Sequence, residues 1–267
     1  MGIINVTPDS FSDGSQLGET SGERFVVDID KVLRQAEQMI AEGALILDVG
    51  GESTRPGALA ISLQEELDRV LPVLRALGER FDICLSVDTS TPKIMRAAIV
   101  EGVGIVNDVR ALSNSGTLEA VLKSNVAICL MHMQGQPRTM QQNFSYNNVV
   151  AEVVDYLRER VSMCESKGIA AQRLIVDPGF GFGKAVEHNY QLLKNLHQLT
   201  ELNLPVLIGV SRKSMIGAAT ARPVNERLAG SIAATSFALL GGANIIRTHD
   251  VAATIDAIRV HSAYSKA

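Results

Sequence analysis

Eight short apolar runs recur along this chain of 267 residues, and each ends at or beside a polar side chain. Stretches with helical periodicity lie between them. The strand-like runs cover residues 1–4, 44–47, 84–88, 104–106, 127–131, 174–177, 206–210 and 244–246. The clearest helical stretches cover residues 29–42, 63–77, 92–100, 149–167 and 227–240. Apolar strands that alternate with helices of this length indicate parallel βαβ units.

Eight such units in a chain of this size predict an α/β fold, a (β/α)8 TIM barrel that forms a single domain over residues 1–267. The alternative is an open, doubly wound sheet, which has the same alternation and the same length. Polar residues at the end of every run favour the barrel, because all eight carboxyl ends of its strands meet at one mouth.

Composition excludes several classes of protein. A content of 46% hydrophobic and 20% charged residues is enough for a large core. A net charge of −4 without basic runs argues against nucleic-acid binding. Apolar stretches too short for a bilayer, and no visible leader, predict a cytoplasmic protein without a membrane partner. Cys84, Cys129 and Cys164 are too far apart for a zinc motif, and we interpret them as core residues.

Three polar residues end predicted strands and form the first candidate site. Asp88, Asn107 and Asp177 would surround one side of the barrel mouth. Buried carboxylates and amides are costly unless a ligand satisfies them, and Lys213 could neutralise part of the charge. Each residue taken alone could instead cap the helix that follows it.

Arg247 and His249 form a second candidate site after the eighth strand. Their spacing of two places both side chains on one face of the chain. TIM barrels commonly bind phosphate beside the loops after strands 7 and 8, and these two side chains suit a diphosphate. The alternative is an exposed ion pair between Arg247 and Asp250.

Three loops are rich in turn-forming residues. The segments 5–14 and 50–57 combine hydroxyl groups, carboxylates and amides with Pro and Gly, which is typical of functional loops. The glycine-rich segment 179–184 fits neither common nucleotide-binding spacing. We interpret it as a tight turn that brings Phe182 close to a flat ligand.

The segments 5–14, 50–57 and 177–182, together with Ser211-Arg212-Lys213-Ser214, resemble the dihydropteroate synthases, pterin-binding enzymes of folate biosynthesis. The resemblance extends from residue 2 to about residue 260. It implies a transferase that condenses 6-hydroxymethyl-7,8-dihydropterin pyrophosphate with p-aminobenzoate, giving 7,8-dihydropteroate and pyrophosphate. It also implies Mg²⁺ as cofactor, sulfonamides as competitors and a homodimer, for which residues 229–243 are a candidate surface.

The resemblance also implies roles for individual residues. Asp88, Asn107, Asp177 and Lys213 would bind the pterin, and Met131 belongs to the same substrate-binding set. The anion site would be Asn5, Arg55, Arg247 and His249, with Asn5 helping to hold the metal. The p-aminobenzoate pocket would be Thr54, Arg55, Pro56, Phe182, Lys213 and Ser214. The catalytic set is Asn5, Arg55, Lys213, Arg247 and His249.

Three other functions remain open at this point. A corrinoid-type methyl-transfer module would share the barrel and the pterin site but would need no pyrophosphate site. A catalytically silent relative would only bind ligand, and an aldolase would use Lys213 for a Schiff base. Members of the family usually carry a hairpin before the first strand, so we expect that this chain lacks that cap and exposes an apolar barrel base.

Overall fold

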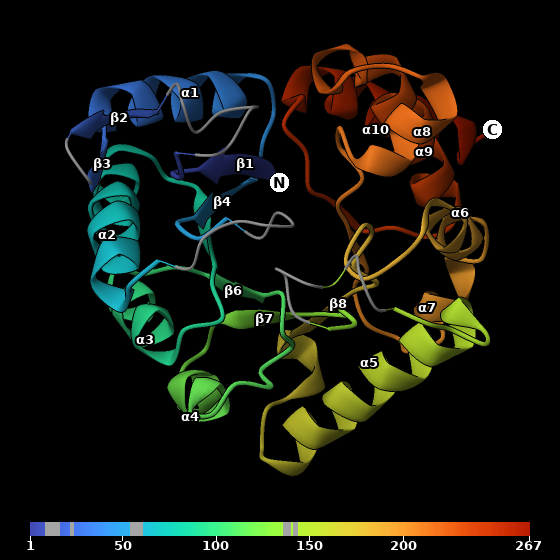
Figure 1. Ribbon diagram of the computed structural model, residues 1–267, viewed down its shortest axis with the longest axis horizontal. Coiled ribbons are helices and arrows are strands. Elements are labelled where there is room, and N and C mark those ends of the chain that lie inside the picture. Colours follow the sequence, from blue (N-terminus) through green and yellow to red (C-terminus); the bar gives the residue numbers. More distant parts are fainter. Residues whose placement is uncertain (9–16, 22–23, 54–60, 136–139, 141–143) are drawn as a thin grey trace.

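A ring of eight parallel strands forms the centre of the fold. The structure, a computed structural model, describes residues 1–8, 17–21, 24–53, 61–135, 140 and 144–267. In Figure 1 helices surround the strands on the outside. The strands of the ring are β1 (Gly2–Asn5), β4 (Ile46–Gly50), β5 (Cys84–Asp88), β6 (Ile105–Asp108), β7 (Ala127–Met131), β8 (Leu174–Asp177), β9 (Leu207–Ile208) and β10 (Ile245–Ile246).

Backbone pairing follows the ring all the way round. Strands β1, β4, β5, β6, β7 and β8 form one parallel sheet, and β9 pairs with β10. A parallel bridge between Val176 and Val206 joins β8 to the β9 segment, and a bridge between Gly2 and Thr248 joins β1 to the end of β10. The sheet therefore returns to its first strand, which confirms the predicted TIM barrel and rules out the open sheet.

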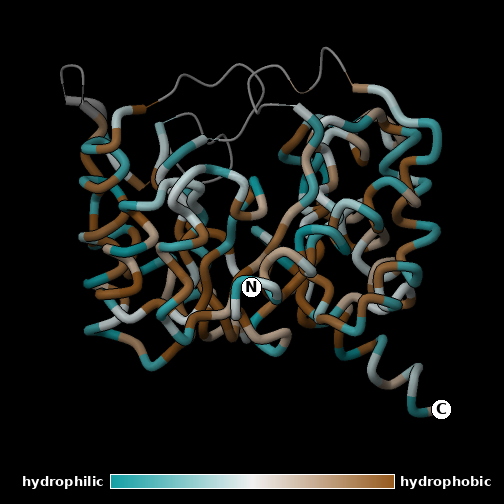
Figure 2. Tube along the Cα trace, turned by 90° about the horizontal axis from the view of Figure 1, so that it is seen from below, coloured by the Kyte–Doolittle hydropathy of each residue, from teal (hydrophilic) through white to brown (hydrophobic). Residues whose placement is uncertain are grey.

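Helices cover the outside of the ring. They are α1 (Ile29–Ala41), α2 (Leu63–Arg80), α3 (Pro92–Val100), α4 (Thr117–Leu122), α5 (Val149–Ser166), α6 (Val186–Lys194), α7 (His197–Thr200), α8 (Ser214–Thr220), α9 (Leu228–Leu240) and α10 (Val251–Tyr264). In the part of the chain that is described, no helix combines the length and the apolar character needed to cross a membrane. Hydrophobic and hydrophilic segments alternate along the helices (Figure 2), as expected when one face packs on a barrel.

An antiparallel hairpin, β2 (Gly18–Ser21) and β3 (Arg24–Val27), precedes α1 and was not predicted. Its β3 strand contacts α2, where Arg69 lies over the ring of Phe25 at 5.6 Å from the centroid. The hairpin therefore packs outside the barrel ring.

The barrel interior changes character along its axis. Cys129, Ile175 and Leu207 form a small apolar cluster inside the ring, separate from the large core between strands and helices. Successive side chains on a strand alternate between its faces, so Met131 and Asp177 lie on the same face two residues further along. The barrel interior is thus apolar in its middle, around Cys129, Ile175 and Leu207, and polar towards the carboxyl ends of the strands.

The prediction that all three cysteines are core residues is wrong for Cys84. Cys129 and Cys164 are buried, whereas Cys84 is exposed. Cys84 is the first residue of β5 and Asp88 is the last, so the thiol lies at the barrel end opposite the mouth.

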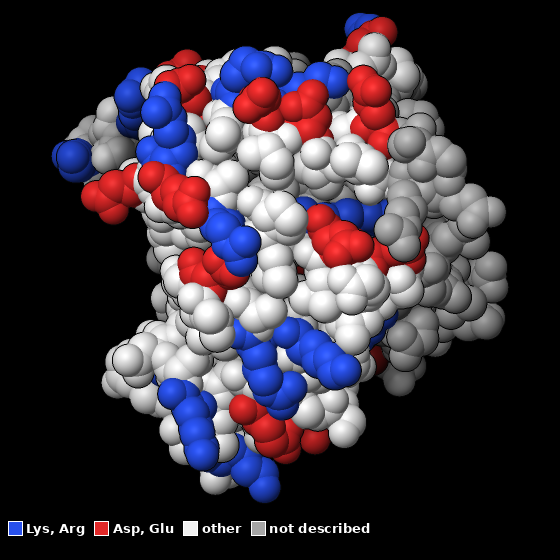
Figure 3. All heavy atoms as spheres, turned by 90° about the vertical axis from the view of Figure 1, so that its left-hand side faces the viewer, with Lys and Arg blue, Asp and Glu red and all other residues white. Residues whose placement is uncertain are grey.

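The face around α2 and α3 carries charges of both signs (Figure 3). Arg75 of α2, for example, lies 2.6 Å from Glu101, which follows α3. Charges of both signs are therefore intermixed on this face.

Candidate active site

A buried carboxylate, Asp48 of β4, organises the polar part of the barrel interior. Its Oδ2 accepts hydrogen bonds from Arg247 Nε at 2.6 Å and Asn107 Nδ2 at 3.1 Å. Its Oδ1 accepts from Ser86 Oγ at 2.5 Å. Arg247 also donates through Nη2 to Asp88 Oδ2 at 3.0 Å. Side chains from four strand segments are therefore locked into one network.

This network contradicts the alternative reading of Arg247. Its guanidinium binds Asp48 and Asp88, whereas Asp250 accepts two hydrogen bonds from Arg212, at 2.5 and 3.0 Å. The alternative of an exposed pair between Arg247 and Asp250 is therefore ruled out, because Arg247 points into the barrel towards two carboxylates.

Burial and neighbouring charges shift the ionisation of the network. Burial raises the pKa of Asp88 to about 7, although Arg247 opposes this shift. Burial alone would lower the pKa of Arg247, but the carboxylates of Asp48 and Asp88 raise it above its ordinary value. The cation is thus permanent, while Asp88 can exchange its proton near neutrality.

Lys213 lies on the segment between β9 and α8, beside the loop after β8. Its Nζ donates to the carbonyl oxygen of Phe180 and lies 4.8 Å from the centroid of the Phe182 ring. Burial lowers the pKa of Lys213 to about 8, opposed by the charge of Asp177. Asp177 Oδ1 accepts from the backbone N–H of Gly179 at 2.7 Å, and burial raises the pKa of this carboxyl.

The two candidate sites lie at the same polar end of the barrel interior. The charges of Lys213 and Arg247 both act on Asp177, and the charge of Asp88 acts on Lys213. The hydrogen bonds of Arg247 with Asp48 and Asp88, and the pairing of Asp177 with Met131 at the ends of β8 and β7, place these groups at the same end of the barrel. The acidic side chains near the barrel interior and the cationic side chains of the last strands therefore face one another.

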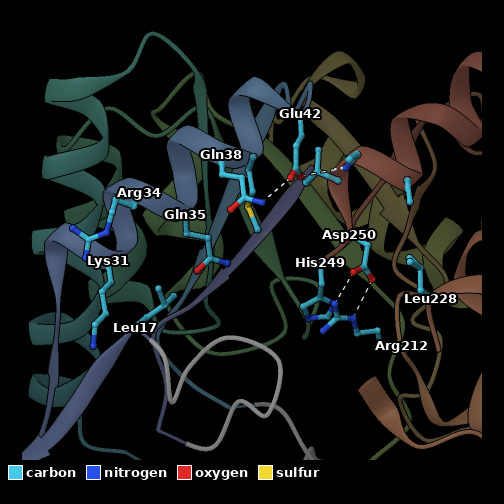
Figure 4. A pocket seen from close by; sticks show the side chains of 14 residues that line it. Leu17, Lys31, Arg34, Gln35, Gln38, Glu42, Arg212, Leu228, His249 and Asp250 are labelled. Atoms are coloured by element: carbon cyan, nitrogen blue, oxygen red, sulfur yellow. Dashed lines mark hydrogen bonds and ion pairs between the residues drawn. The ribbon is translucent and has the colours of Figure 1, made fainter. Parts of the chain in front are cut away.

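His249 lines a groove beside α1. Its Nδ1 is 3.0 Å from Ser211 Oγ, and its backbone N–H donates to the same oxygen at 3.2 Å. Figure 4 shows His249 beside the ion pair of Arg212 and Asp250, facing a groove of about 690 Å³ along α1. Lys31 and Gln38 of α1 also line the groove.

Asn5, at the end of β1, reaches towards the acidic side of the cavity. Asn5 pairs with Gly50 in the ladder, and a Cβ atom added to Gly50 would lie 3.4 Å from Asn5 Oδ1 and 3.5 Å from Asp88 Cβ. The absence of a side chain at Gly50 thus leaves room for the amide and the carboxylate to approach each other.

The remaining predicted residues are divided between described and undescribed parts of the chain. Met131 ends β7, is buried and pairs with Asp177 in the ladder. Ser214 is the first residue of α8 and is exposed, as expected for a position at a helix start. The predicted residues Thr54, Arg55 and Pro56 lie outside the described residues.

Comparison with known proteins agrees with this geometry. The sequence model of the family described as "Pterin binding enzyme" matches residues 1–249. The chain belongs to the pterin-binding enzyme family. A dihydropteroate synthase of Haemophilus influenzae is 51% identical over 267 residues, covering 100% of this chain and 94% of the relative. The resemblance seen in the loop sequences is thereby confirmed.

Solved structures of this family have the same fold. A Yersinia pestis dihydropteroate synthase in complex with a sulfonamide drug superposes with a TM-score of 0.93 at 45% identity, covering 100% of this chain and 94% of that one. A Xanthomonas albilineans dihydropteroate synthase with 4-aminobenzoic acid gives a TM-score of 0.90 at 46% identity, covering 100% and 92%.

Sequence reasoning missed two buried residues near this family site. Asp48 follows an apolar run as Asp88 and Asp177 do, so its position did carry a signal. Lys184 is the last residue of the glycine-rich segment 179–184 and is only 3% exposed. Lysines are rarely buried, and nothing in its local sequence indicated that this one would be.

Proposed function

We propose that this protein condenses 6-hydroxymethyl-7,8-dihydropterin pyrophosphate with p-aminobenzoate, releasing pyrophosphate and forming 7,8-dihydropteroate. The observation that carries this proposal is that the Arg247 guanidinium donates hydrogen bonds to both Asp48 and Asp88. A cation suited to a diphosphate therefore lies directly beside the buried acidic network. The names of the relatives support the same reaction. We expect the reaction to take place in the cytoplasm, as the composition predicted.

The pterin fits the acidic side of the cavity. A 2-amino-4-oxopyrimidine edge offers adjacent N–H donors, and the carboxylate of Asp177 can accept two of them. Asn107 donates to Asp48 through Nδ2, so its carbonyl oxygen remains as an acceptor for the ring. Asp88 supplies a second carboxyl group, and buried Met131 supplies an apolar wall.

The diphosphate fits the cationic end. Arg247 and His249, with Arg55 from the second loop, would bind its oxygens. Asn5 Oδ1 is a hard oxygen donor of the type that Mg²⁺ prefers, so Asn5 would hold the metal. In the described part of the chain no cluster of three His, Cys, Asp or Glu residues could chelate a metal, so substrate oxygens and water would complete the coordination. When bound, Mg²⁺ would neutralise charge on the diphosphate.

The p-aminobenzoate would lie between the loops at the mouth. Phe182 and Lys213 form one wall, and the free amides at the start of α8 beside Ser214 suit a carboxylate. Thr54, Arg55 and Pro56 would form the opposite wall. The Xanthomonas albilineans relative binds 4-aminobenzoic acid and the Yersinia pestis relative binds a sulfonamide, so we expect sulfonamides to compete here.

The chemistry follows from this arrangement. The bond between the hydroxymethyl carbon and the diphosphate oxygen breaks, and electron donation from the pterin ring stabilises the resulting cation. The arylamine nitrogen then forms the new bond to carbon and loses a proton. The protein supplies charge neutralisation and orientation rather than a nucleophile. Lys213 donates to the carbonyl of Phe180, which favours a binding role over a Schiff base.

Pyrophosphate release tests the proposal. Purified protein should release pyrophosphate only when the pterin pyrophosphate, p-aminobenzoate and Mg²⁺ are all present. Release without p-aminobenzoate would indicate hydrolysis, and binding without any release would indicate a silent relative. Methyl transfer from methyltetrahydrofolate to a corrinoid protein would support the other pterin-binding function, which needs no cationic diphosphate site.

A further inference from the structure

Lys184 is a buried lysine close to the proposed site, with three short contacts. Its Nζ donates to the carbonyl oxygens of Gly179 at 2.9 Å and Phe182 at 3.0 Å, and lies 2.9 Å from His132 Nδ1. A fourth, longer contact of 3.4 Å joins it to the carbonyl of His132. Burial lowers the pKa of Lys184 well below its ordinary value. The protonated amine has three hydrogens, so the three short contacts match its capacity and offset part of the cost of burial.

The carbonyls that Lys184 binds belong to the glycine-rich loop after β8. Gly179, Gly181 and Gly183 all have left-handed backbone conformations, with φ of 68°, 81° and 60°. A Cβ atom at Gly179 would lie 1.9 Å from the carbonyl oxygen of His132, so the loop is pressed against the segment after β7. Lys184 binds both of these segments and fastens one to the other.

The other side of the same loop holds Lys213. The Phe180 carbonyl accepts from Lys213 Nζ, and the Phe182 ring lies 4.8 Å from that nitrogen. Phe182 is therefore contacted twice, through its carbonyl by Lys184 and through its ring by Lys213. A shift of the loop would move both the carbonyl and the ring that define the position of Lys213.

We propose that Lys184 is a positioning residue, which fastens the 179–183 loop to His132 and thereby sets the place of Phe182 and Lys213 for p-aminobenzoate. The inference rests on the proposed function, because it takes Lys213 and Phe182 as the wall of that pocket. The short contacts of Lys184 are with the loop backbone and His132, so it acts through the loop.

His132 is the residue to which Lys184 fastens the loop. It is buried and stacks edge-on against the ring of Tyr156, with centroids 4.9 Å apart. Burial lowers the pKa of His132 to about 3, so the ring is neutral and its Nδ1 can accept from Lys184. Tyr146 adds a second fastening point by donating to the carbonyl of Gly183 at 2.8 Å.

The Lys184→Met variant tests the role, because methionine keeps the apolar stem and removes all three donors. We expect the KM for p-aminobenzoate to rise at least about tenfold, while the dissociation constant of the pterin pyrophosphate changes less than about threefold. The matched control is Lys194→Met on exposed α6 surface, which should leave both constants unchanged.

If Lys184→Met does not fold, two variants of His132 test the positioning role of Lys184 instead. Asparagine at position 132 keeps an acceptor near the place of Nδ1, whereas leucine removes it. We expect His132→Asn to retain a KM for p-aminobenzoate within about threefold of the wild type, and His132→Leu to raise it as Lys184→Met does.

Three results would overturn the positioning role: an unchanged KM in Lys184→Met, equal weakening of both substrates, or the same KM in both His132 variants. All require that the wild-type protein releases pyrophosphate only with both substrates. If the wild type does not, the proposed function fails. Crystal structures of the wild type and Lys184→Met would then still show whether the loss of Lys184 shifts the 179–183 loop.

Discussion

Asp48 shows how one buried carboxylate can define a ligand site without facing the ligand. It is 0% exposed, and its hydrogen bonds fix the amide of Asn107 and the guanidinium of Arg247. Fixed donors are most effective when they need no rearrangement on binding. In the proposed function, Asp48 would thus prepare both Asn107 for the pterin and Arg247 for the diphosphate.

Replacing Asp48 with asparagine should therefore damage both stability and binding. The change leaves the Arg247 cation with only Asp88 as a carboxylate partner, and breaking a buried pair in this way costs about 3 kcal/mol of the free energy of unfolding. Urea unfolding measures that loss, and calorimetry should show weaker pterin binding. Asp155→Asn, at an exposed pair with Arg158, is the control and should leave both unchanged. Wild-type stability in Asp48→Asn would contradict the network.

Asp88 should make pterin binding depend on pH. Its pKa rises from 3.8 to about 7 on folding, so the folded protein binds more protons than the unfolded chain between these values. Its contribution to the free energy of unfolding therefore falls as the pH rises through that window. N–H donors of a pterin favour the ionised carboxyl, so binding should strengthen up to about pH 7 and then level off.

Calorimetric titration with 6-hydroxymethylpterin between about pH 5.5 and 7.5 checks this prediction, because that ligand carries no phosphate to titrate. The affinity should rise up to about tenfold per pH unit below the pKa. Asp88→Asn should bind weakly with no such slope. Equal wild-type affinity at both ends of the range would refute the assignment.

The acidic and cationic residues were predictable because each ends a recognisable apolar run. Asp88 and Asp177 are the last residues of β5 and β8, and Arg247 directly follows β10. Asp48 was harder to identify because it lies in the middle of β4 rather than at its end. The burial of Lys184 depends on contacts with His132, 52 residues away, and local sequence carries no such information.

Two helices at the C-terminal end of the chain present an apolar outer surface. Phe237 and Leu240 of α9 are 60% and 59% exposed, and Val260 and Tyr264 of α10 are 70% and 71% exposed. Ile232 and Ala257 help to line a groove of about 420 Å³ between the helices. This surface overlaps the predicted 229–243 segment, so we propose that it is where a second copy binds.

Phe237→Asp should then produce a monomer, because a buried charge at the centre of a symmetric interface has no partner. Light scattering coupled to size exclusion measures the mass directly. Val100→Asp is the matched control, since Val100 at the end of α3 is 85% exposed and lies outside this surface. A wild-type monomer would refute the proposed dimer, and a Phe237→Asp dimer would place the interface elsewhere.

Helix and strand positions followed the sequence where patterns were long. The helix predicted at 92–100 has those limits, and the one predicted at 63–77 continues to Arg80. The run at 206–210 contains a strand of only two residues, Leu207–Ile208. The β2–β3 hairpin was missed because β2 reads Gly-Glu-Thr-Ser, which lacks the apolar alternation of a typical strand.

At the scale of the whole molecule, closure of the ring is what brings distant residues together. Arg247 and Asp48 are 199 positions apart, yet they share a hydrogen bond because β10 and β4 both neighbour β1. The barrel was predictable from eight repeated units, whereas the shared partners inside it depend on how the strands are staggered. The single-domain organisation over residues 1–267 stays a prediction.

The exposed position of Cys84 makes it a site for selective chemical labelling. The other two thiols are buried, so a maleimide dye should attach selectively at this one, at the barrel end opposite the mouth. Partial burial raises the pKa of Cys84, so labelling will go faster in mildly alkaline buffer. Such a conjugate would report ligand uptake by fluorescence while leaving the entrance unobstructed.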